Sequence, residues 1–394
     1  MAQHRGLTRL DLQLIAFGGR LPRAGSFGFS MRLCLFSVLS VTVFMMCHGD
    51  ALASDETPWS RDCVGHLEIS LPDKADVAAT AFDQLFQPKR TLYSEFEDGQ
   101  SAFYSKYGYA GQMEITRRLS SEENQRFLAD VRKTVGQIKA DADGYKKANA
   151  DMPEGGYEQF DVKEGDGLAV RRFRFFYAAR SVKSHALRWE LSTPEDRIPE
   201  FVQFMNKLIN AVELRDNFTV PSAPGLCMPH VFIPIDGAEI YGHSIATTYR
   251  LKSHPDVTVL LEDASARRPY PSQDPAKLTA VYKSNFFWTQ DYRSYDSIKN
   301  LLTLRRHNTI EFAGQKGVES MVSMIRKDKV TEDYGYLVVT DGDPNAGNQK
   351  PELMFYVIRD ARNAENRGMQ PIGKDEFFKL AREIAASVKL RSAP

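Results

Sequence analysis

The sequence predicts an α+β protein with two tandem, duplicated domains, each a mainly antiparallel sheet with packed helices. Segments rich in branched and aromatic residues follow one another with few helical segments between them. This pattern is typical of antiparallel α+β domains rather than of a doubly wound parallel sheet. A helical segment of similar pattern also occurs twice, near the end of each half of the chain. A repeat on that scale indicates duplicated domains.

The repeated segments are residues 200–215 and 376–391. Both begin with Glu-Phe and end with Val-x-Leu-Arg, and each carries its apolar residues on one helical face. A strand-like segment precedes each helix. A cysteine followed by a strand-like segment, at Cys63 and again at Cys227, opens each half. The Pro/Gly-rich stretch 220–225 cannot continue a helix and therefore predicts the boundary between the halves.

Between these ends, five further segments have the composition of strands: 168–177, 257–261, 279–282, 318–325 and 336–339. A long helix is predicted over 121–148, because Ser120 and Glu123 form a capping box at its start. The apolar stripe of this helix consists of Phe127, Val131, Val135 and Ile138.

Residues 31–53 have the pattern of a secretory signal peptide. Met31-Arg32 supplies a positive start, an apolar run follows, and Ala51-Leu52-Ala53 is an A-x-A cleavage site. The apolar run is too short for a comfortable membrane span. A buried helix is the alternative interpretation. We expect residues 1–30 to be an over-extended start, and Ser54 to be the first residue of the mature protein.

The mature protein is then expected in the bacterial periplasm, with an N-terminal domain over 54–220 and a C-terminal domain over 221–394. The whole chain has 51 basic and 51 acidic side chains. Without residues 1–53, 46 basic and 49 acidic side chains remain, a net charge of −3. This balance gives no reason to expect nucleic acid or an anionic membrane surface as a partner. We expect no stable membrane insertion after the signal is removed.

Cys34 and Cys47 leave with the signal, so that Cys63 and Cys227 remain in an oxidising compartment. Two thiols in such a compartment tend to form a disulfide. Separate burial of the two cysteines is the other interpretation, and the sequence leaves both open.

Three patterns resemble sites of chemistry. Gly242-His243-Ser244-Ile245-Ala246 resembles the nucleophile elbow of hydrolases, but a strand-like segment follows where a helix is required. Residues 341–352 place oxygen ligands as in a calcium-binding EF-hand loop, but strand-like segments flank them and Ala346 replaces the essential glycine. The mature histidines have no metal-ligand spacing. The sequence therefore predicts no catalytic, cofactor or metal site, and no enzyme.

Two clusters mix aromatic and polar residues, which is the composition of binding hot spots at protein interfaces. The alternative is that these aromatic residues fill the core of a sheet. The candidate interface residues are Phe286, Phe287, Trp288, Tyr292, Arg293 and Tyr295 in one cluster, and Tyr104, Tyr107 and Tyr109 in the other.

The order of these motifs resembles a known family. The opening Cys63-Val64-Gly65 with its strand ending in Leu71-Pro72, the second opening Pro224-Gly225-Leu226-Cys227, the segment 314–319 and the repeated closing helix are similar to the immunity proteins of type VI secretion lipase effectors, specifically those cognate to the fourth phospholipase family. The resemblance implies two immunity domains that clamp a cognate periplasmic phospholipase, without a cofactor.

Two other functions remain as alternatives to this resemblance. One is a periplasmic module that binds lipid or a small ligand in a pocket between sheet and helix. The other is a serine hydrolase built on Ser244. A stoichiometric complex with a lipase, co-purified lipid without a protein partner, or activity that depends on Ser244 would separate the three.

Overall fold

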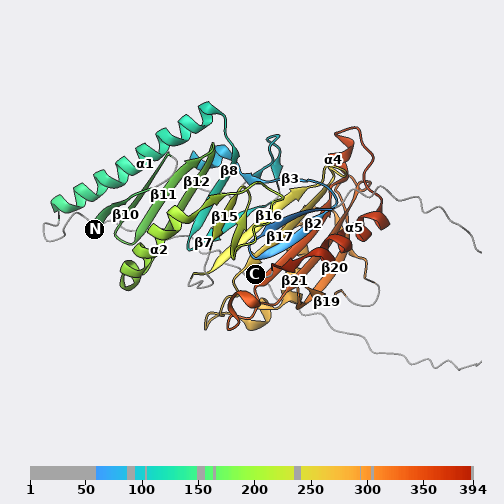
Figure 1. Ribbon diagram of the computed structural model, residues 1–394. Coiled ribbons are helices and arrows are strands. Elements are labelled where there is room, and N and C mark those ends of the chain that lie inside the picture. Colours follow the sequence, from blue (N-terminus) through green and yellow to red (C-terminus); the bar gives the residue numbers. More distant parts are fainter. Residues whose placement is uncertain are drawn as a thin grey trace, which may run out of the picture. The chain divides into compact units, whose positions relative to one another are not determined.

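One sheet, antiparallel in nearly all of its pairings, runs through both halves of the chain (Figure 1). The computed structural model describes residues 59–86, 94–102, 104–148, 156–162, 166–234, 241–292, 294–302 and 306–391, so that the predicted N-terminal extension and signal peptide lie outside the described residues. The order of neighbouring strands in the first half is β9 (Tyr157–Phe160), β10 (Asp166–Arg172), β11 (Phe175–Val182), β12 (His185–Ser192), β8 (Gln112–Arg118) and β7 (Lys106–Tyr109).

The sheet continues into the second half without a break, because β7 pairs with β16 from His243 to Ala246. From there the order is β16 (His243–Arg250), β17 (Val257–Ala264), β22 (Glu352–Arg359), β21 (Glu332–Thr340) and β20 (Gln315–Ile325), with β18 (Ser297–Asn300) and β19 (Asn308–Phe312) both paired with β20. Of the short strands, β3 (Asp76–Val77) pairs with β16 and β4 (Ala79–Thr80) with β8, which closes a circuit of strands around the junction. Strands β5 (Ser94–Glu95) and β6 (Ser101–Ala102) extend from β4.

The predicted α+β class is confirmed, since the chain combines a few helices with mainly antiparallel strands. The duplication of its domains stays a prediction. Residues 56–394 form one compact unit, and the two halves share hydrogen bonds along β7 and β16. The division into an N-terminal domain over 54–220 and a C-terminal domain over 221–394 stays a prediction.

One face of the sheet is covered by helix α1 at one end and by helix α3 at the other. Helix α1 (Ser121–Ala148) has the predicted bounds and packs Phe127 and Val131 against side chains of β10 to β12. Its capping box is formed, because the Ser120 hydroxyl accepts from the Glu123 N–H at 3.1 Å and the Glu123 carboxylate from the Ser120 N–H at 2.8 Å. Helix α3 (Ala280–Phe286) and the π-helical turn 287–291 pack against β20 to β22.

The opposite face carries the repeated helices, α2 (Ile198–Ala211) and α5 (Lys374–Ser387), together with two β-hairpins. Each helix leads into a two-residue strand, β13 (Glu213–Leu214) or β23 (Lys389–Leu390). The first hairpin is β1 (Ser60–Val64) with β2 (Leu67–Leu71), and the second is β14 (Gly225–Met228) with β15 (Val231–Pro234). Large buried side chains from helices, hairpins and sheet form a single hydrophobic core here.

The closing strands are exchanged between the halves. Strand β13, which ends the first half, pairs with β15 of the second hairpin, and β23, which ends the second half, pairs with β2 of the first hairpin. Each hairpin is therefore completed by a strand from the other half. This arrangement ties the two ends of the described chain together across the junction.

Two local predictions were wrong. Residues 279–282 begin helix α3 instead of forming a strand, because the Thr279 hydroxyl accepts from the Tyr282 N–H at 3.3 Å and caps the helix. Residues 168–177 do not form one strand but parts of β10 and β11, joined by a turn at Phe173, which has a positive φ of 51°. Branched and aromatic composition alone could not locate either the cap or the turn.

Replacing Gly335 by alanine is expected to destabilise the protein by about 1–3 kcal/mol, as overpacked cores do. A Cβ atom at this position would lie 2.4 Å from Cη2 of the buried Trp288 ring and 3.0 Å from Cγ2 of Val322. The matched control is Gly136→Ala in the middle of α1, where a Cβ atom would meet nothing within 4 Å. That change should stabilise the helix by about 0.5–1 kcal/mol. Denaturant unfolding of both variants measures the two effects, and effects of the same sign would contradict this packing.

Candidate functional site

Five of the predicted interface residues lie in the interior. Phe287, Trp288 and Tyr292 are buried against the sheet, where the Trp288 Nε1–H donates to the Ser320 hydroxyl at 2.8 Å. Tyr107 and Tyr109 are buried on the opposite face of the sheet. These side chains are core residues and are not accessible to a partner. They fit the alternative interpretation, in which these aromatic residues fill the core of a sheet.

The remaining candidates are closer to solvent. Phe286, Tyr104 and Tyr295 are half-buried, and the Tyr295 hydroxyl donates to Asp333 at 2.9 Å. Arg293 lies outside the described residues. The partly accessible aromatic residues therefore stay candidates for an interface. The buried residues, which are the majority of the two clusters, are no longer candidates.

A cavity of about 470 Å³ lies where the strands of the two halves pair. Its lining includes Lys106, Gln112, Ser244 and Arg267, together with glycines of the β7–β8 hairpin. The Ser244 hydroxyl donates to Oε1 of Glu262 at 3.0 Å. Burial raises the pKa of Glu262 above its usual value, and Lys106 and the Ser244 hydroxyl offset part of that rise.

In this structure the Ser244 hydroxyl is used in the hydrogen bond to Glu262. Ser244 lies inside strand β16, so the strand-to-helix turn of a nucleophile elbow is not formed. Neighbouring residues of a strand point to opposite faces, and His243 accordingly points away from Ser244. The calcium-loop pattern at residues 341–352 is the connection between β21 and β22, where Asp341 accepts from the Ala280 N–H.

On the opposite face, Asp263 connects two histidines. Its Oδ1 lies 2.9 Å from His243 Nε2, and its Oδ2 lies 2.9 Å from His66 Nδ1 and accepts from the His66 N–H at 2.7 Å. Ser265 Oγ lies 2.9 Å from His243 Nδ1. Burial would raise the pKa of Asp263, but the two imidazoles beside it hold this pKa well below its usual range.

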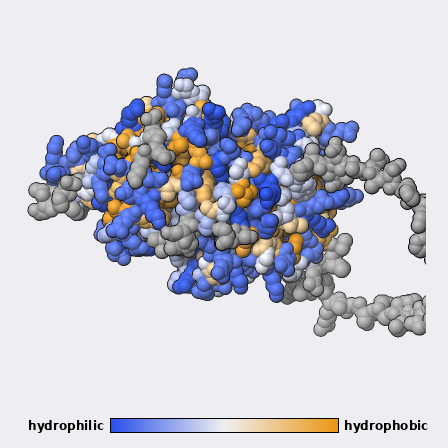
Figure 2. All heavy atoms as spheres, in the orientation of Figure 1, coloured by the Kyte–Doolittle hydropathy of each residue, from blue (hydrophilic) through white to orange (hydrophobic). Residues whose placement is uncertain are grey.

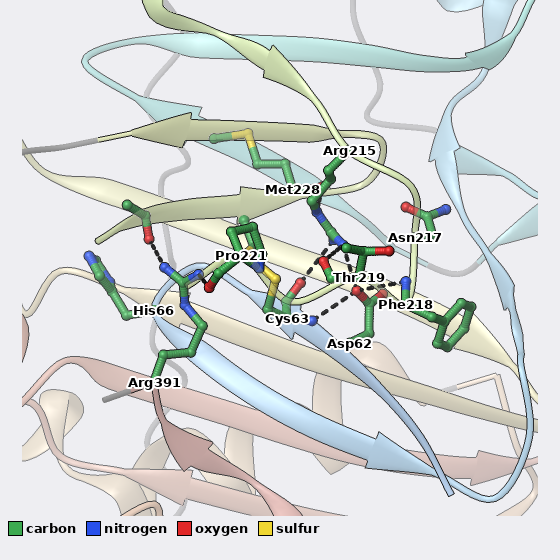
Figure 3. The surroundings of a disulfide bond; sticks show 12 residues. Asp62, Cys63, His66, Arg215, Asn217, Phe218, Thr219, Pro221, Met228 and Arg391 are labelled. Atoms are coloured by element: carbon green, nitrogen blue, oxygen red, sulfur yellow. Dashed lines mark hydrogen bonds and ion pairs between the residues drawn. A yellow bond between two sulfur atoms is a disulfide. The ribbon is translucent and has the colours of Figure 1, made fainter. Parts of the chain in front are cut away.

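A buried ion pair lies beside this cluster, at the junction of the halves (Figure 3). Asp62 is fully buried, and its Oδ1 lies 2.7 Å from Nη1 of Arg215. Tyr249 donates its hydroxyl to Asp62 Oδ2 at 3.1 Å, and the Phe218 N–H donates to Oδ1 at 3.2 Å. The Arg215 guanidinium also donates to the carbonyls of Met228 and Cys63, at 3.1 and 3.2 Å. The pair thus has the hydrogen bonds that a buried charge needs.

The structure joins Cys63 and Cys227 in a disulfide, with Cα atoms 5.6 Å apart. Beside it, Gly65 and Cys227 exchange backbone hydrogen bonds of 2.8 and 3.0 Å. The sequence left open whether these two cysteines form a disulfide or are buried separately. In the structure they form the disulfide.

The arginines that end the repeated segments have matching roles. The Arg215 N–H donates to the His230 carbonyl in the turn of the second hairpin, and the Arg391 N–H donates to the His66 carbonyl in the turn of the first. The Arg391 side chain reaches the carbonyls of Pro221 and Gly225. Sequence analysis found these arginines as part of the repeat but assigned them no function. Their partners, Asp62 above all, lie in segments that no spacing rule connects with them.

Comparison with known proteins finds a family that resembles the second half of the chain. Residues 219–393 match the family model of the Tle cognate immunity protein 4 C-terminal domain. This part of the chain is therefore similar to the C-terminal domain of that immunity protein. No curated protein matches the chain.

Solved structures of immunity proteins share the fold of this chain. The immunity protein TplEi of the type VI secretion system of Pseudomonas aeruginosa, complexed with an "L" peptide, superposes with a TM-score of 0.54 at 14% identity, over 86% of this chain and 99% of that one. Its apo form gives 0.53 at 13% identity, over 86% and 98%. A structure of the Tle4–Tli4 complex gives 0.52 at 16% identity, over 86% and 99%.

Removing the disulfide is expected to destabilise the protein by up to about 5 kcal/mol, because it closes a long loop in the unfolded chain. The measurement is denaturant unfolding of a Cys63→Ala, Cys227→Ala double variant and of the wild type with and without a reductant. Reductant should lower the stability of the wild type and leave the double variant unchanged. A double variant as stable as the oxidised wild type would contradict this role of the bond.

Acid is expected to destabilise the second hairpin through His230. Burial lowers the pKa of His230 to about 3, and His185 and Arg215 add to this effect. Because the unfolded histidine titrates near pH 6.5 (about the usual value), it binds a proton that the folded protein excludes, and the stability that His230 contributes falls as the pH drops below that value.

The variant for this test is His230→Asn, because asparagine tolerates the positive φ of 60° at this position. Unfolding of both proteins between neutral pH and pH 4 should show a smaller loss for the variant. Parallel stability curves would mean that His230 does not titrate in this way.

Proposed function

We propose that this chain is a periplasmic immunity protein that binds and inhibits a cognate type VI secretion phospholipase, and that it is not an enzyme. The match of residues 219–393 to the Tle cognate immunity protein 4 C-terminal domain carries this proposal. The relatives support it, since one is described in a complex of Tle4 with Tli4 and another in complex with a peptide. In this function the two halves clamp the lipase so that it cannot open onto lipid.

The disulfide supports export to the periplasm. Disulfides persist in oxidising compartments such as the bacterial periplasm and are rare in the cytosol of mesophiles. Residues 31–53 have the pattern of the signal peptide that such export requires. No helix among the described residues is long and apolar enough to cross a membrane.

The surface offers a composition suited to protein binding. Figure 2 shows several separate groups of apolar residues among the hydrophilic ones on the face drawn. The segment that leaves β17 carries Arg267 and Tyr270, and the Tyr270 side chain is 73% exposed. Arg267 also lines the cavity at the junction. Tyr and Arg are the residue types that dominate interface energies.

Tyr270 was not among the predicted interface residues, because it stands apart from both aromatic clusters. The signal was present in the order Arg267-Arg268-Pro269-Tyr270, in which two arginines and a tyrosine flank a proline that favours a loop. We propose that this loop contributes to the lipase-binding surface, together with the half-buried Tyr104, which interacts electrostatically with Arg267.

The decisive experiment is co-purification of the mature chain with the lipase whose gene neighbours its own. A stable stoichiometric complex in which lipid hydrolysis is lost is the expected outcome. Co-purified lipid without a protein partner would favour the alternative of a ligand-binding module. Hydrolysis by the isolated chain that disappears in Ser244→Ala would favour the hydrolase.

Within that complex, Tyr270→Ala is expected to weaken binding about 30-fold, the effect of losing one interface hot spot. The control is Val330→Ala, which shortens another apolar side chain, 85% exposed, in the β20–β21 turn away from the cavity. Titration calorimetry with the lipase measures both affinities. Equal affinities of the wild type and Tyr270→Ala would remove this loop from the interface without removing the function.

A further inference from the structure

Three side chains converge at the junction in the manner of metal ligands. His66, His243 and Asp263 each offer one nitrogen or carboxylate oxygen atom, and these three atoms all lie within 4.8 Å of one another. They come from three separate places, the β1–β2 turn, the start of β16 and the end of β17. His66 belongs to the first half of the chain, and His243 and Asp263 belong to the second.

The backbone around the cluster is shaped for the carboxylate. Gly65 has a φ of 57°, and a Cβ atom there would lie 2.3 Å from Asp263 Oδ2. Only glycine therefore allows the β1–β2 turn to approach Asp263 so closely. The His66 N–H uses this approach to donate to the same oxygen at 2.7 Å. The carboxylate is thus held between the two imidazoles.

The orientation of the His243 ring is also fixed by a contact at its other nitrogen, Nδ1. Ser265 Oγ lies 2.9 Å from His243 Nδ1 and accepts from the His243 backbone N–H at 2.9 Å. A serine oxygen has two lone pairs, so it can accept a hydrogen bond from Nδ1 in the tautomer that carries a proton there. On binding zinc, His243 Nε2 would give up its hydrogen bond to Asp263 and offer its lone pair to the ion. An oxygen acceptor on the second ring nitrogen is the usual support of a metal-binding histidine.

We propose that His66, His243 and Asp263 bind a zinc ion at the junction of the halves. Two imidazole nitrogens and one carboxylate form a ligand set that suits zinc, whereas calcium and magnesium prefer oxygen ligands only. Asp263 and His243 are buried, but the His66 side chain is 20% exposed, so the ion would enter from the side of His66. The nearby Arg391 guanidinium is directed at the carbonyls of Pro221 and Gly225.

Zinc in this position would connect the turn of the first hairpin to β16 and β17. The disulfide already connects the same hairpin to the second hairpin, three residues away from His66 along the chain. The ion would therefore stabilise the junction through contacts that the disulfide does not make. This inference does not depend on the proposed lipase partner.

The test uses the mature chain with its disulfide intact, stripped of metal and titrated with CoCl₂ and with ZnCl₂. The wild type should bind one equivalent of cobalt with the visible absorption of a four-coordinate site, and zinc should displace it. Zinc should also raise the unfolding temperature. His66→Gln and Asp263→Asn should each weaken zinc binding at least tenfold.

The matched control is His185→Gln. His185 stacks on His230 with ring centroids 4.4 Å apart, so it belongs to a second histidine pair, which has a different set of neighbours. This variant should bind zinc like the wild type. Should Asp263→Asn fail to fold, His66→Gln decides, because His66 lies in a partly exposed turn. A wild type that binds neither metal, or zinc binding that survives His66→Gln, would overturn the proposal.

Discussion

The junction depends on one buried carboxylate. Asp62 is fully removed from water, and a carboxylate in that position costs several kcal/mol unless it is paired and hydrogen-bonded. Its partners come from the segment after β13 and from β16, while Asp62 itself lies in β1. The charge is therefore satisfied only when the first hairpin, the link between the halves and the central sheet have all assembled. Breaking such a pair typically costs about 3–5 kcal/mol, so the ion pair enforces this one arrangement.

The strand exchange and the disulfide act on the same arrangement. Each hairpin is completed by the closing strand of the other half, and Cys63–Cys227 joins the two hairpins directly. The continuous sheet through β7 and β16 adds a third connection. Three independent connections hold the two halves in a fixed relation. A surface that is already ordered loses less conformational entropy on binding a partner, so the junction favours affinity even where it makes no contact itself.

The sequence predicted what is local and periodic. The capping box placed α1 correctly, and the repeated Val-x-Leu-Arg segments identified α2 and α5. What it could not predict depends on pairing between distant segments. Neither the exchange of β13 and β23 nor the convergence of His66 with Asp263 has a signature in spacing. The aromatic clusters show the same limit, because composition does not distinguish the buried Trp288 from an exposed aromatic residue such as Tyr270.

The polar residues of β16 take part in hydrogen-bond networks that hold the fold in place. Adjacent positions of β16 direct Ser244 toward Glu262 on one face and His243 toward Asp263 on the other, so the residues that resemble a hydrolase motif serve two different hydrogen-bond networks. The charged groups at the junction have protein partners and fix the backbone. An inhibitor needs this, because its free energy of binding comes from many contacts presented in one geometry rather than from a reactive group. In the proposed function, the buried charge of Asp62 therefore fixes the shape in which the exposed surface near Tyr270 meets the lipase.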